Sequence, residues 1–398
     1  MTTPDTQNPS IKNNIKKIYF IEALAGMFFS VPIFVLFWQE NGLSLTQIML
    51  LQSYFAIFIV ALEIPTGYYA DLHGRKKSII ISAITLFFAM ITYSLGHNFF
   101  HFLIAETLFA FSVSFSSGAL SALVYDTLQD LGQEKSYKKI WGNIMFYQTL
   151  ALSFANVIGG FIAKYDLRYT LYASLPFFII MIPITFFLCE PQRHKTIIKE
   201  GYLKELFNIL KFALLENKKL RWIIIYSAII YAFNQSALWF YQPYFKTTGL
   251  DIAYFGIVFA SFQLFSAFSS KYAHKLEEKL GEKYSMIMLV FLLSTSYFLM
   301  SNFIFLFSFS FCFLQQFIRG FRSTVVNEYI NKLTTSSVRA TILSAESFIG
   351  RLIYAIILPI FGWIADIYTV IQALTVIGIT SLISGIIILV FLRKDKVI

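Results

Sequence analysis

The sequence predicts an all-α polytopic membrane protein with about twelve transmembrane helices, and its composition and length support this fold class. Of its 398 residues, 57% are hydrophobic and only 14% are charged, whereas soluble domains carry about 25% charged residues. Its 45 Phe residues are too many for one soluble core, so apolar side chains must face lipid. A membrane-spanning helix needs roughly 20 apolar residues, and the chain has room for about twelve such spans with short connections.

Apolar runs of membrane length follow one another along the chain and are separated by short polar breaks. The breaks at 39–42 and 96–98 contain turn-forming residues. Because a helix satisfies its own backbone hydrogen bonds, each run is expected to cross the bilayer as a helix. The runs are residues 15–38, 46–69, 77–96, 99–124, 139–163, 168–189, 222–245, 250–272, 284–301, 303–330, 340–365 and 369–392.

The distribution of Lys and Arg indicates how these helices are oriented. With the N-terminus in the cytoplasm, the cytoplasmic segments hold 26 of the 32 Lys and Arg residues, the outer loops hold 3 and the spans hold 3. Since these residues are enriched in cytoplasmic loops of membrane proteins, we expect both termini in the cytoplasm and the protein in the inner (cytoplasmic) membrane. The net charge of +10 then faces anionic lipid, and we expect no nucleic-acid binding.

The longest polar stretch divides the chain into two halves of six predicted spans each. We expect an N-terminal six-helix bundle at 1–189, a cytoplasmic linker at 190–221 and a C-terminal six-helix bundle at 222–398. Within the linker, Leu203, Leu206 and Leu210 recur at helical spacing among lysines, which indicates an amphipathic helix on the membrane surface. Similar short segments at 160–163 and 362–365 support two related halves.

A charged loop between the second and third predicted spans carries a recognisable pattern. Residues 67–77 read Gly-Tyr-Tyr-Ala-Asp-Leu-His-Gly-Arg-Lys-Lys. This loop resembles the signature G-x-L-a-D-r-x-G-r-k of the major facilitator superfamily. It departs from the signature at Tyr69 and Leu72 and matches it at Gly67, Asp71, Gly74, Arg75 and Lys76. The resemblance implies the major facilitator fold, in which two six-helix bundles are related by pseudo-two-fold symmetry, and a secondary transporter that works as a monomer.

The resemblance also implies a role for this loop. In the family, the aspartate joins the two halves when the protein faces outward and lets go when it faces inward. Asp71 is therefore expected to be a conformational latch rather than a substrate ligand. The alternative reading from the residues alone is a charged, capped turn.

Two carboxylates within predicted spans are candidates for proton coupling. A charge at mid-bilayer costs at least about 2.5–3.5 kcal/mol, so it should face a cavity or a partner. The resemblance implies that spans one, four, seven and ten line a central cavity. Glu22 lies in span one and Glu106 in span four, and either could take up a proton. The alternative is an ion pair or hydrogen bond that fixes helix packing.

Polar and aromatic side chains of spans seven and ten are candidate substrate contacts. Arg319 and Arg322 share a face of span ten, and their guanidinium groups could bind a carboxylate or phosphate. Alternatively, these arginines pair with Glu328 or Glu346. The candidate substrate cavity comprises Asn234, Gln235, Trp239, Gln242, Gln315, Arg319 and Arg322.

The chain lacks the metalloprotease, nucleophile-elbow and nucleotide-loop motifs, so we expect neither an enzyme nor an ATP-driven pump, and neither a cofactor nor a metal. We predict alternating-access transport that couples protons to export of an amphipathic organic small molecule, such as a drug, siderophore or metabolite. The segment 155–160 keeps two glycines of the drug-antiporter pattern G-P-x-x-G-G but lacks its Gly-Pro. Uptake of a nutrient or metal chelate by a symporter or facilitator, movement of lipid-linked headgroups, and a non-transporting membrane receptor are the alternatives.

Overall fold

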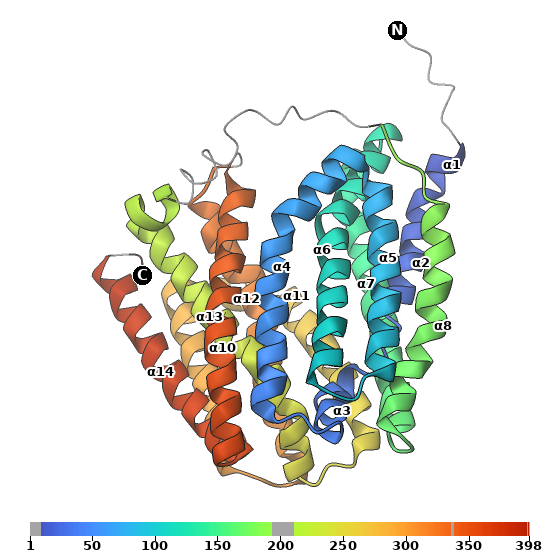
Figure 1. Cartoon of the computed structure of the whole chain (residues 1–398). Helices are drawn as coiled ribbons and strands as arrows, with labels where there is room; N and C mark the ends of the chain where they lie inside the picture. Colours follow the sequence, from blue (N-terminus) through green and yellow to red (C-terminus); the bar gives the residue numbers. More distant parts are fainter. Residues whose placement is uncertain (1–8, 193–210, 336–337, 396, 398) are drawn as a thin grey trace. The chain divides into compact units, whose positions relative to one another are not determined.

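The structure, a computed structural model, describes residues 9–192, 211–335, 338–395 and 397 (Figure 1). The described residues form helices and no strand. The expected amphipathic helix of the linker falls largely on 193–210 and so lies outside the described residues. The α-helices are α1 (Pro9–Lys12), α2 (Asn14–Ala25), α3 (Phe34–Glu40), α4 (Leu45–His73), α5 (Arg75–Leu95), α6 (Phe99–Asp130), α7 (Tyr137–Ala163), α8 (Leu167–Phe186), α10 (Lys218–Thr247), α11 (Ile252–Asn302), α12 (Cys312–Lys332), α13 (Arg339–Ile367) and α14 (Val370–Lys394). Short 3-10 or π turns are η1 (Val31–Ile33), η2 (Glu134–Ser136), η3 (Phe212–Glu216) and η4 (Leu306–Phe311).

Membrane-length segments account for most of the described chain. Nine helices there are long and apolar enough to cross a membrane. Eight of them are single spans, and α11 contributes two because its helical geometry breaks at Gly281. The more polar α12 and the broken first segment add one span each. The described residues therefore hold the twelve spans that the sequence predicts.

The first span differs from the single helix expected over 15–38. It consists of α2, the turn η1 and α3, and the chain between α2 and η1 is not helical. Two glycines explain how this stretch packs against α7. A Cβ atom on Gly26 would lie 2.5 Å from the Gln148 carbonyl oxygen, and one on Gly159 would overlap the Phe29 carbonyl oxygen. Backbone therefore meets backbone here, a contact that only glycine permits.

Glycines with positive φ end helices at corresponding loops of the two sequence halves. Gly74 has φ 116° and separates α4 from α5, and Gly281 has φ 72° and divides α11. Both angles favour glycine over residues with a side chain. The signature loop and the break within α11 thus share a conformational feature.

Packing contacts divide the chain into two compact units. Unit 1 comprises Met1–Gly42, Ile57–Thr196 and Ile252–Ala260, and unit 2 comprises Leu43–Ala56, Ile197–Asp251 and Ser261–Ile398. In unit 1, α2 packs against α7 and α8. In unit 2, the corresponding helix α10 packs against α13 and α14. The starts of α4 and α11 each belong to the unit built mainly from the other sequence half, and the division at 190–221 stays a prediction.

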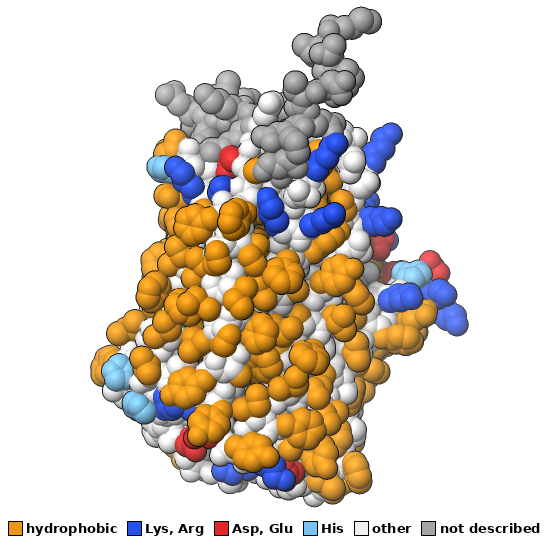
Figure 2. Space-filling model, turned by 90° about the vertical axis from the view of Figure 1, so that its right-hand side faces the viewer, with side chains coloured by type: hydrophobic (Ala, Val, Ile, Leu, Met, Phe, Trp, Pro, Cys, Tyr) orange, Lys and Arg blue, Asp and Glu red, His pale blue; other side chains and the backbone are white. Residues whose placement is uncertain are grey.

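Large apolar side chains lie on the surface, as expected for a lipid-facing protein. Phe100, Tyr165 and Phe187 are 71%, 85% and 69% exposed. Figure 2 shows hydrophobic side chains over most of the visible face. A soluble protein rarely exposes such extensive apolar area, so this surface is suited to a bilayer.

Candidate functional site

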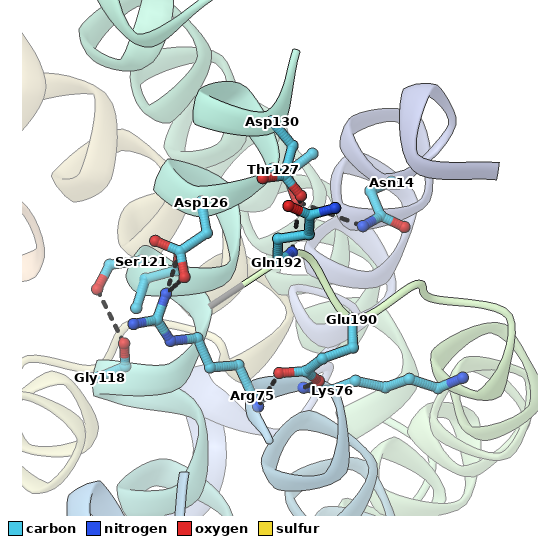
Figure 3. Close-up of polar contacts among 11 residues, drawn as sticks. Asn14, Arg75, Lys76, Gly118, Ser121, Asp126, Thr127, Asp130, Glu190 and Gln192 are labelled. Carbon is cyan, nitrogen blue, oxygen red and sulfur yellow. Dashed lines mark hydrogen bonds and ion pairs between the residues drawn. The ribbon is translucent and has the colours of Figure 1, made fainter. Parts of the chain in front are cut away.

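The signature loop is held by a carboxylate from the end of the sixth span. Gly74 ends α4, and α5 starts directly after it with unsatisfied backbone N–H groups. The Glu190 carboxylate accepts hydrogen bonds from the backbone N–H of Arg75 at 2.9 Å and of Lys76 at 2.8 Å (Figure 3). Glu190 therefore caps the start of α5 and complements the positive end of its helix dipole.

The Arg75 side chain connects the same loop to α6. Its guanidinium forms an ion pair with Asp126 (Figure 3). It also donates a 2.9 Å hydrogen bond to the Ala122 carbonyl. Asp71 lies two residues before the end of α4 and is exposed. The sequence-based site omitted Asp126 and Glu190, which bring α6 and the end of span six to the loop. Their signal was weak, because a carboxylate at a span end is common.

Glu22 is a buried carboxylate in α2 that has a neutral partner. Glu22 is 6% exposed. Its Oε2 accepts a 2.8 Å hydrogen bond from the side-chain amide of Gln148 in α7. Among the described residues it forms no ion pair with a Lys or Arg. An anion taken out of water without a cation is costly, so this environment suits a carboxyl group that gains and loses a proton.

Glu106 is 2% exposed in α6 and lies in an aromatic environment. The Tyr93 hydroxyl forms a hydrogen bond with its carboxyl group. Tyr93 also packs edge-on against Phe34 and is stacked with Phe102. Both candidate carboxylates therefore belong to unit 1, but they have different partners.

In unit 2, amide side chains of α10 and α12 meet. The Asn234 amide donates to the Gln315 side-chain oxygen at 2.7 Å and to its carbonyl oxygen at 2.9 Å. The Gln315 amide in turn donates to the Ser296 hydroxyl in α11. Gln315 is fully buried. This cluster therefore links three helices, and the structure brings together two of the residues predicted to contact substrate.

Aromatic residues extend this polar region. Trp239 donates a 2.6 Å hydrogen bond from its indole nitrogen to the Tyr354 hydroxyl in α13. Gln316 donates to the Tyr241 hydroxyl at 3.1 Å. The sequence-based site omitted Gln316 and Tyr354, although Gln316 is adjacent to the predicted Gln315.

The remaining two amides of span seven differ in burial. Gln235 is half-buried, whereas Gln242 is buried. A substrate would therefore reach Gln242 only after a rearrangement of the surrounding side chains.

Arg322 has a buried carboxylate partner. Its guanidinium lies 2.6 Å from Glu346 Oε1 in α13 and donates to the Ser227 carbonyl oxygen at 3.2 Å. The Ser227 hydroxyl donates to the same Glu346 oxygen at 2.6 Å. The guanidinium also lies 5.0 Å from the centre of the Tyr231 ring. Of the two partners that the sequence offered for Arg322, the structure has Glu346. Glu328 instead forms an ion pair with Lys332, with 3.1 Å between Oε1 and Nζ.

Arg319 differs from Arg322 although both lie on α12. Its side chain is exposed, and it makes no hydrogen bond or ion pair with another described residue. It lies close enough to the Tyr241 hydroxyl to interact electrostatically. Residue 319 is 13 positions from each end of the segment formed by η4 and α12, Leu306 and Lys332. A charged side chain within a membrane span is costly, so Arg319 is a candidate for contact with a polar substrate.

Comparison with known proteins gives the family. The sequence profile of the Major Facilitator Superfamily matches residues 18–245 and 224–397. No curated protein sequence matches the chain. Solved structures of the same fold include a mutant of the nucleoside transporter NupG, with a TM-score of 0.81, 15% identity and coverage of 96% of this chain and 99% of that one.

Two further solved structures have the same fold. A bacterial homologue of the human lysosomal transporter Spinster, in an inward-facing and unoccupied conformation, gives a TM-score of 0.72 at 14% identity and covers 98% of each chain. A D-xylose–proton symporter gives 0.67 at 14% identity, over 95% of this chain and 96% of that one. At such low identities these likenesses show the fold alone. With the profile match over nearly the whole sequence, the chain belongs to the major facilitator superfamily and is a multi-pass membrane transporter of small molecules, not an enzyme.

Proposed function

We propose that the protein couples proton movement to the export of an amphipathic organic small molecule. It does so as a monomer in the inner (cytoplasmic) membrane, with both termini in the cytoplasm and no role in nucleic-acid binding. Transport proceeds by alternating access, in which the substrate site opens to one side of the membrane at a time. One similar structure is a D-xylose–proton symporter, so proton-coupled uptake is the second candidate.

The environment of Glu22 is the observation that carries this proposal. It combines 6% exposure with a neutral amide partner, Gln148, and no ion-pair partner among the residues described. Such a carboxyl group can be neutral while buried and can lose its proton when a conformational change brings it to water. We assign proton coupling to Glu22, and Glu106, which is bonded to Tyr93, serves as the comparison.

The substrate site in this proposal lies along α10 and α12. Asn234, Gln235, Trp239 and Gln315 supply amides and an aromatic surface, which suit an amphipathic organic molecule. Arg319 supplies a positive charge that no described carboxylate neutralises. We therefore favour substrates that carry a carboxylate or phosphate beside an apolar body.

The signature loop controls the conformational cycle in this proposal. Asp71 acts as the latch implied by the family resemblance. Asp126 pairs with the Arg75 side chain, and Glu190 accepts a hydrogen bond from the Arg75 backbone N–H. A latch contributes to the equilibrium between states and makes no contact with substrate. Its replacement by Asn would therefore change the rate of transport without changing substrate binding.

The test of proton coupling is the pH gradient across everted membrane vesicles, followed with a fluorescent proton probe. Cationic drugs, zwitterionic metabolites and anionic iron chelates are added in turn. We expect at least one compound to dissipate the gradient in vesicles that contain the wild type or the matched control Glu106→Gln, but not Glu22→Gln. Gln keeps a hydrogen bond with Gln148, so Glu22→Gln should fold normally.

Two results would overturn parts of this assignment. Full proton flux in Glu22→Gln would remove Glu22 from coupling. If no compound on the panel dissipates the gradient, uptake becomes the better description, and import of radiolabelled compounds into intact cells would then be measured.

A further inference from the structure

The five-residue pattern Gly-x-x-Ala-Asp occurs twice in the chain, at the ends of two different spans. Residues 67–71 lie near the end of α4, and residues 362–366 lie at the end of α13. By the expected topology, the first copy is at the inner side of the membrane and the second at the outer side. Asp71 belongs to the signature loop, whose role is described above. Asp366 lies outside that loop, so its role has to be inferred from its own contacts.

Asp366 binds the start of α4 within unit 2. Its Oδ1 accepts a 2.9 Å hydrogen bond from the backbone N–H of Leu45. Its Oδ2 accepts from the backbone N–H and the hydroxyl of Thr46, at 2.7 and 2.5 Å. The carboxylate thus satisfies two of the N–H groups that a helix start leaves unpaired, and it faces the positive end of the helix dipole.

A glycine one turn earlier brings the same two helices into contact. A Cβ atom on Gly362 would lie 2.7 Å from Met49 Cγ and 2.9 Å from the Leu45 carbonyl oxygen. Met49 and Leu45 are both buried, at 0% and 4% exposure. Asp366 and Gly362 therefore form a two-point contact, with a carboxylate at the rim and close helix packing beneath it.

A second contact of this kind involves α7 and the start of α11, within unit 1. A Cβ atom on Gly256 would overlap the Asn156 carbonyl oxygen, and one on Gly160 would lie 2.6 Å from the Ala253 carbonyl oxygen. In both contacts a helix start from one sequence half packs on a helix from the other half, and all of these segments lie at the outer side of the expected topology. The carboxylate of Asp366 adds a polar component to the first contact.

We propose that Asp366 is an outer latch, which holds α4 and α13 together while the outer side is closed and must release Leu45 and Thr46 before that side opens. This inference rests on the alternating-access mechanism proposed above. It gives α4 a carboxylate at each end: Asp366 bonded to its start and Asp71 on its last turns. Weakening the outer contact shifts the population toward the state that is open to the outside.

The test measures access to the contact rather than transport. Met49→Cys is introduced into a chain with Cys189→Ser and Cys312→Ser, and its reaction with a membrane-impermeant maleimide is followed in right-side-out vesicles. With Asp366 present, labelling should be slow because position 49 is buried beneath the latch. Asp366→Asn places an amide where the carboxylate accepts, and we expect labelling about tenfold faster, which corresponds to about 1.4 kcal/mol.

Two further variants keep the test decisive. Glu40→Gln removes an exposed carboxylate at the end of α3 and should leave the labelling rate unchanged. Thr46→Val removes the hydroxyl bond while both backbone bonds stay, so it should give a smaller increase and serves if Asp366→Asn does not fold. Equal labelling with and without the carboxylate, or fast labelling with Asp366 in place, would overturn the latch. Faster labelling in Asp366→Asn, combined with no compound-dependent proton flux in the wild type, would support the latch and contradict the proposed function alone.

Discussion

Glu22 and Glu346 are equally buried carboxylates with opposite chemical surroundings. Each residue is 6% exposed. Glu22 accepts one hydrogen bond, from the Gln148 amide. Glu346 forms an ion pair with the Arg322 guanidinium and accepts a hydrogen bond from the Ser227 hydroxyl, both at 2.6 Å. A cation neutralises the charge of a buried carboxylate, whereas an amide partner leaves that charge uncompensated. Burial alone therefore does not separate the carboxylate proposed for coupling from one in an ion pair, but the partner does.

The largest effect is expected from removing the carboxylate of the ion pair. Glu346→Ala leaves the buried Arg322 charge without its partner, and breaking a buried pair in this way costs about 3–5 kcal/mol. We expect a much smaller yield of folded protein and a lower thermal unfolding midpoint in detergent.

A double replacement separates the charge from the packing. Arg322→Met combined with Glu346→Leu removes both charges, and apolar replacement of a buried pair is often close to neutral. The double variant should therefore recover most of the lost stability. If Glu346→Ala alone unfolds at the wild-type temperature, the pair does not hold α10, α12 and α13 together.

The next effect concerns the two arginines of α12. Arg322 is neutralised by Glu346, whereas Arg319 is exposed and has no bonded partner among the described residues. Arg319→Gln should weaken the apparent affinity for an anionic substrate about tenfold, equivalent to about 1.4 kcal/mol, with an unchanged unfolding midpoint. The measurement is transport rate against substrate concentration.

A charge-conserving variant sharpens this comparison. Arg319→Lys keeps the positive charge but loses the planar fork that binds a carboxylate at two points, so an intermediate loss is expected. If Arg319→Gln transports an anionic substrate with unaltered affinity, the exposed cation does not bind the substrate.

Hydropathy predicted the helical fold well because each lipid-facing span must be apolar over its full length. It could not predict the break between α2 and α3, where the Phe29 backbone lies against Gly159 of a distant helix. The site was less predictable because its contacts, too, join residues that are far apart in the sequence. The sequence placed Glu22 in a span but did not predict its partner Gln148, which lies 126 positions away. For Arg322 it offered Glu328 or Glu346, and tertiary packing selects between them.

The smallest effect is expected at a third carboxylate, Glu190, which is half-buried and caps the start of α5. Glu190 accepts hydrogen bonds from two backbone N–H groups, those of Arg75 and Lys76, whereas Glu346 pairs with a charged guanidinium. Loss of the Glu190 cap should therefore cost only about 1 kcal/mol of stability. Glu190→Gln keeps one acceptor and should increase local opening of the loop. Trypsin cleavage after Arg75 to Lys77 should then be about fivefold faster, because about 1 kcal/mol changes the open population by that factor. Glu134→Gln, at an exposed site in η2, is the matched control and should not change the rate. Equal cleavage of both variants would show that the loop is held by Arg75 and Asp126 without the cap.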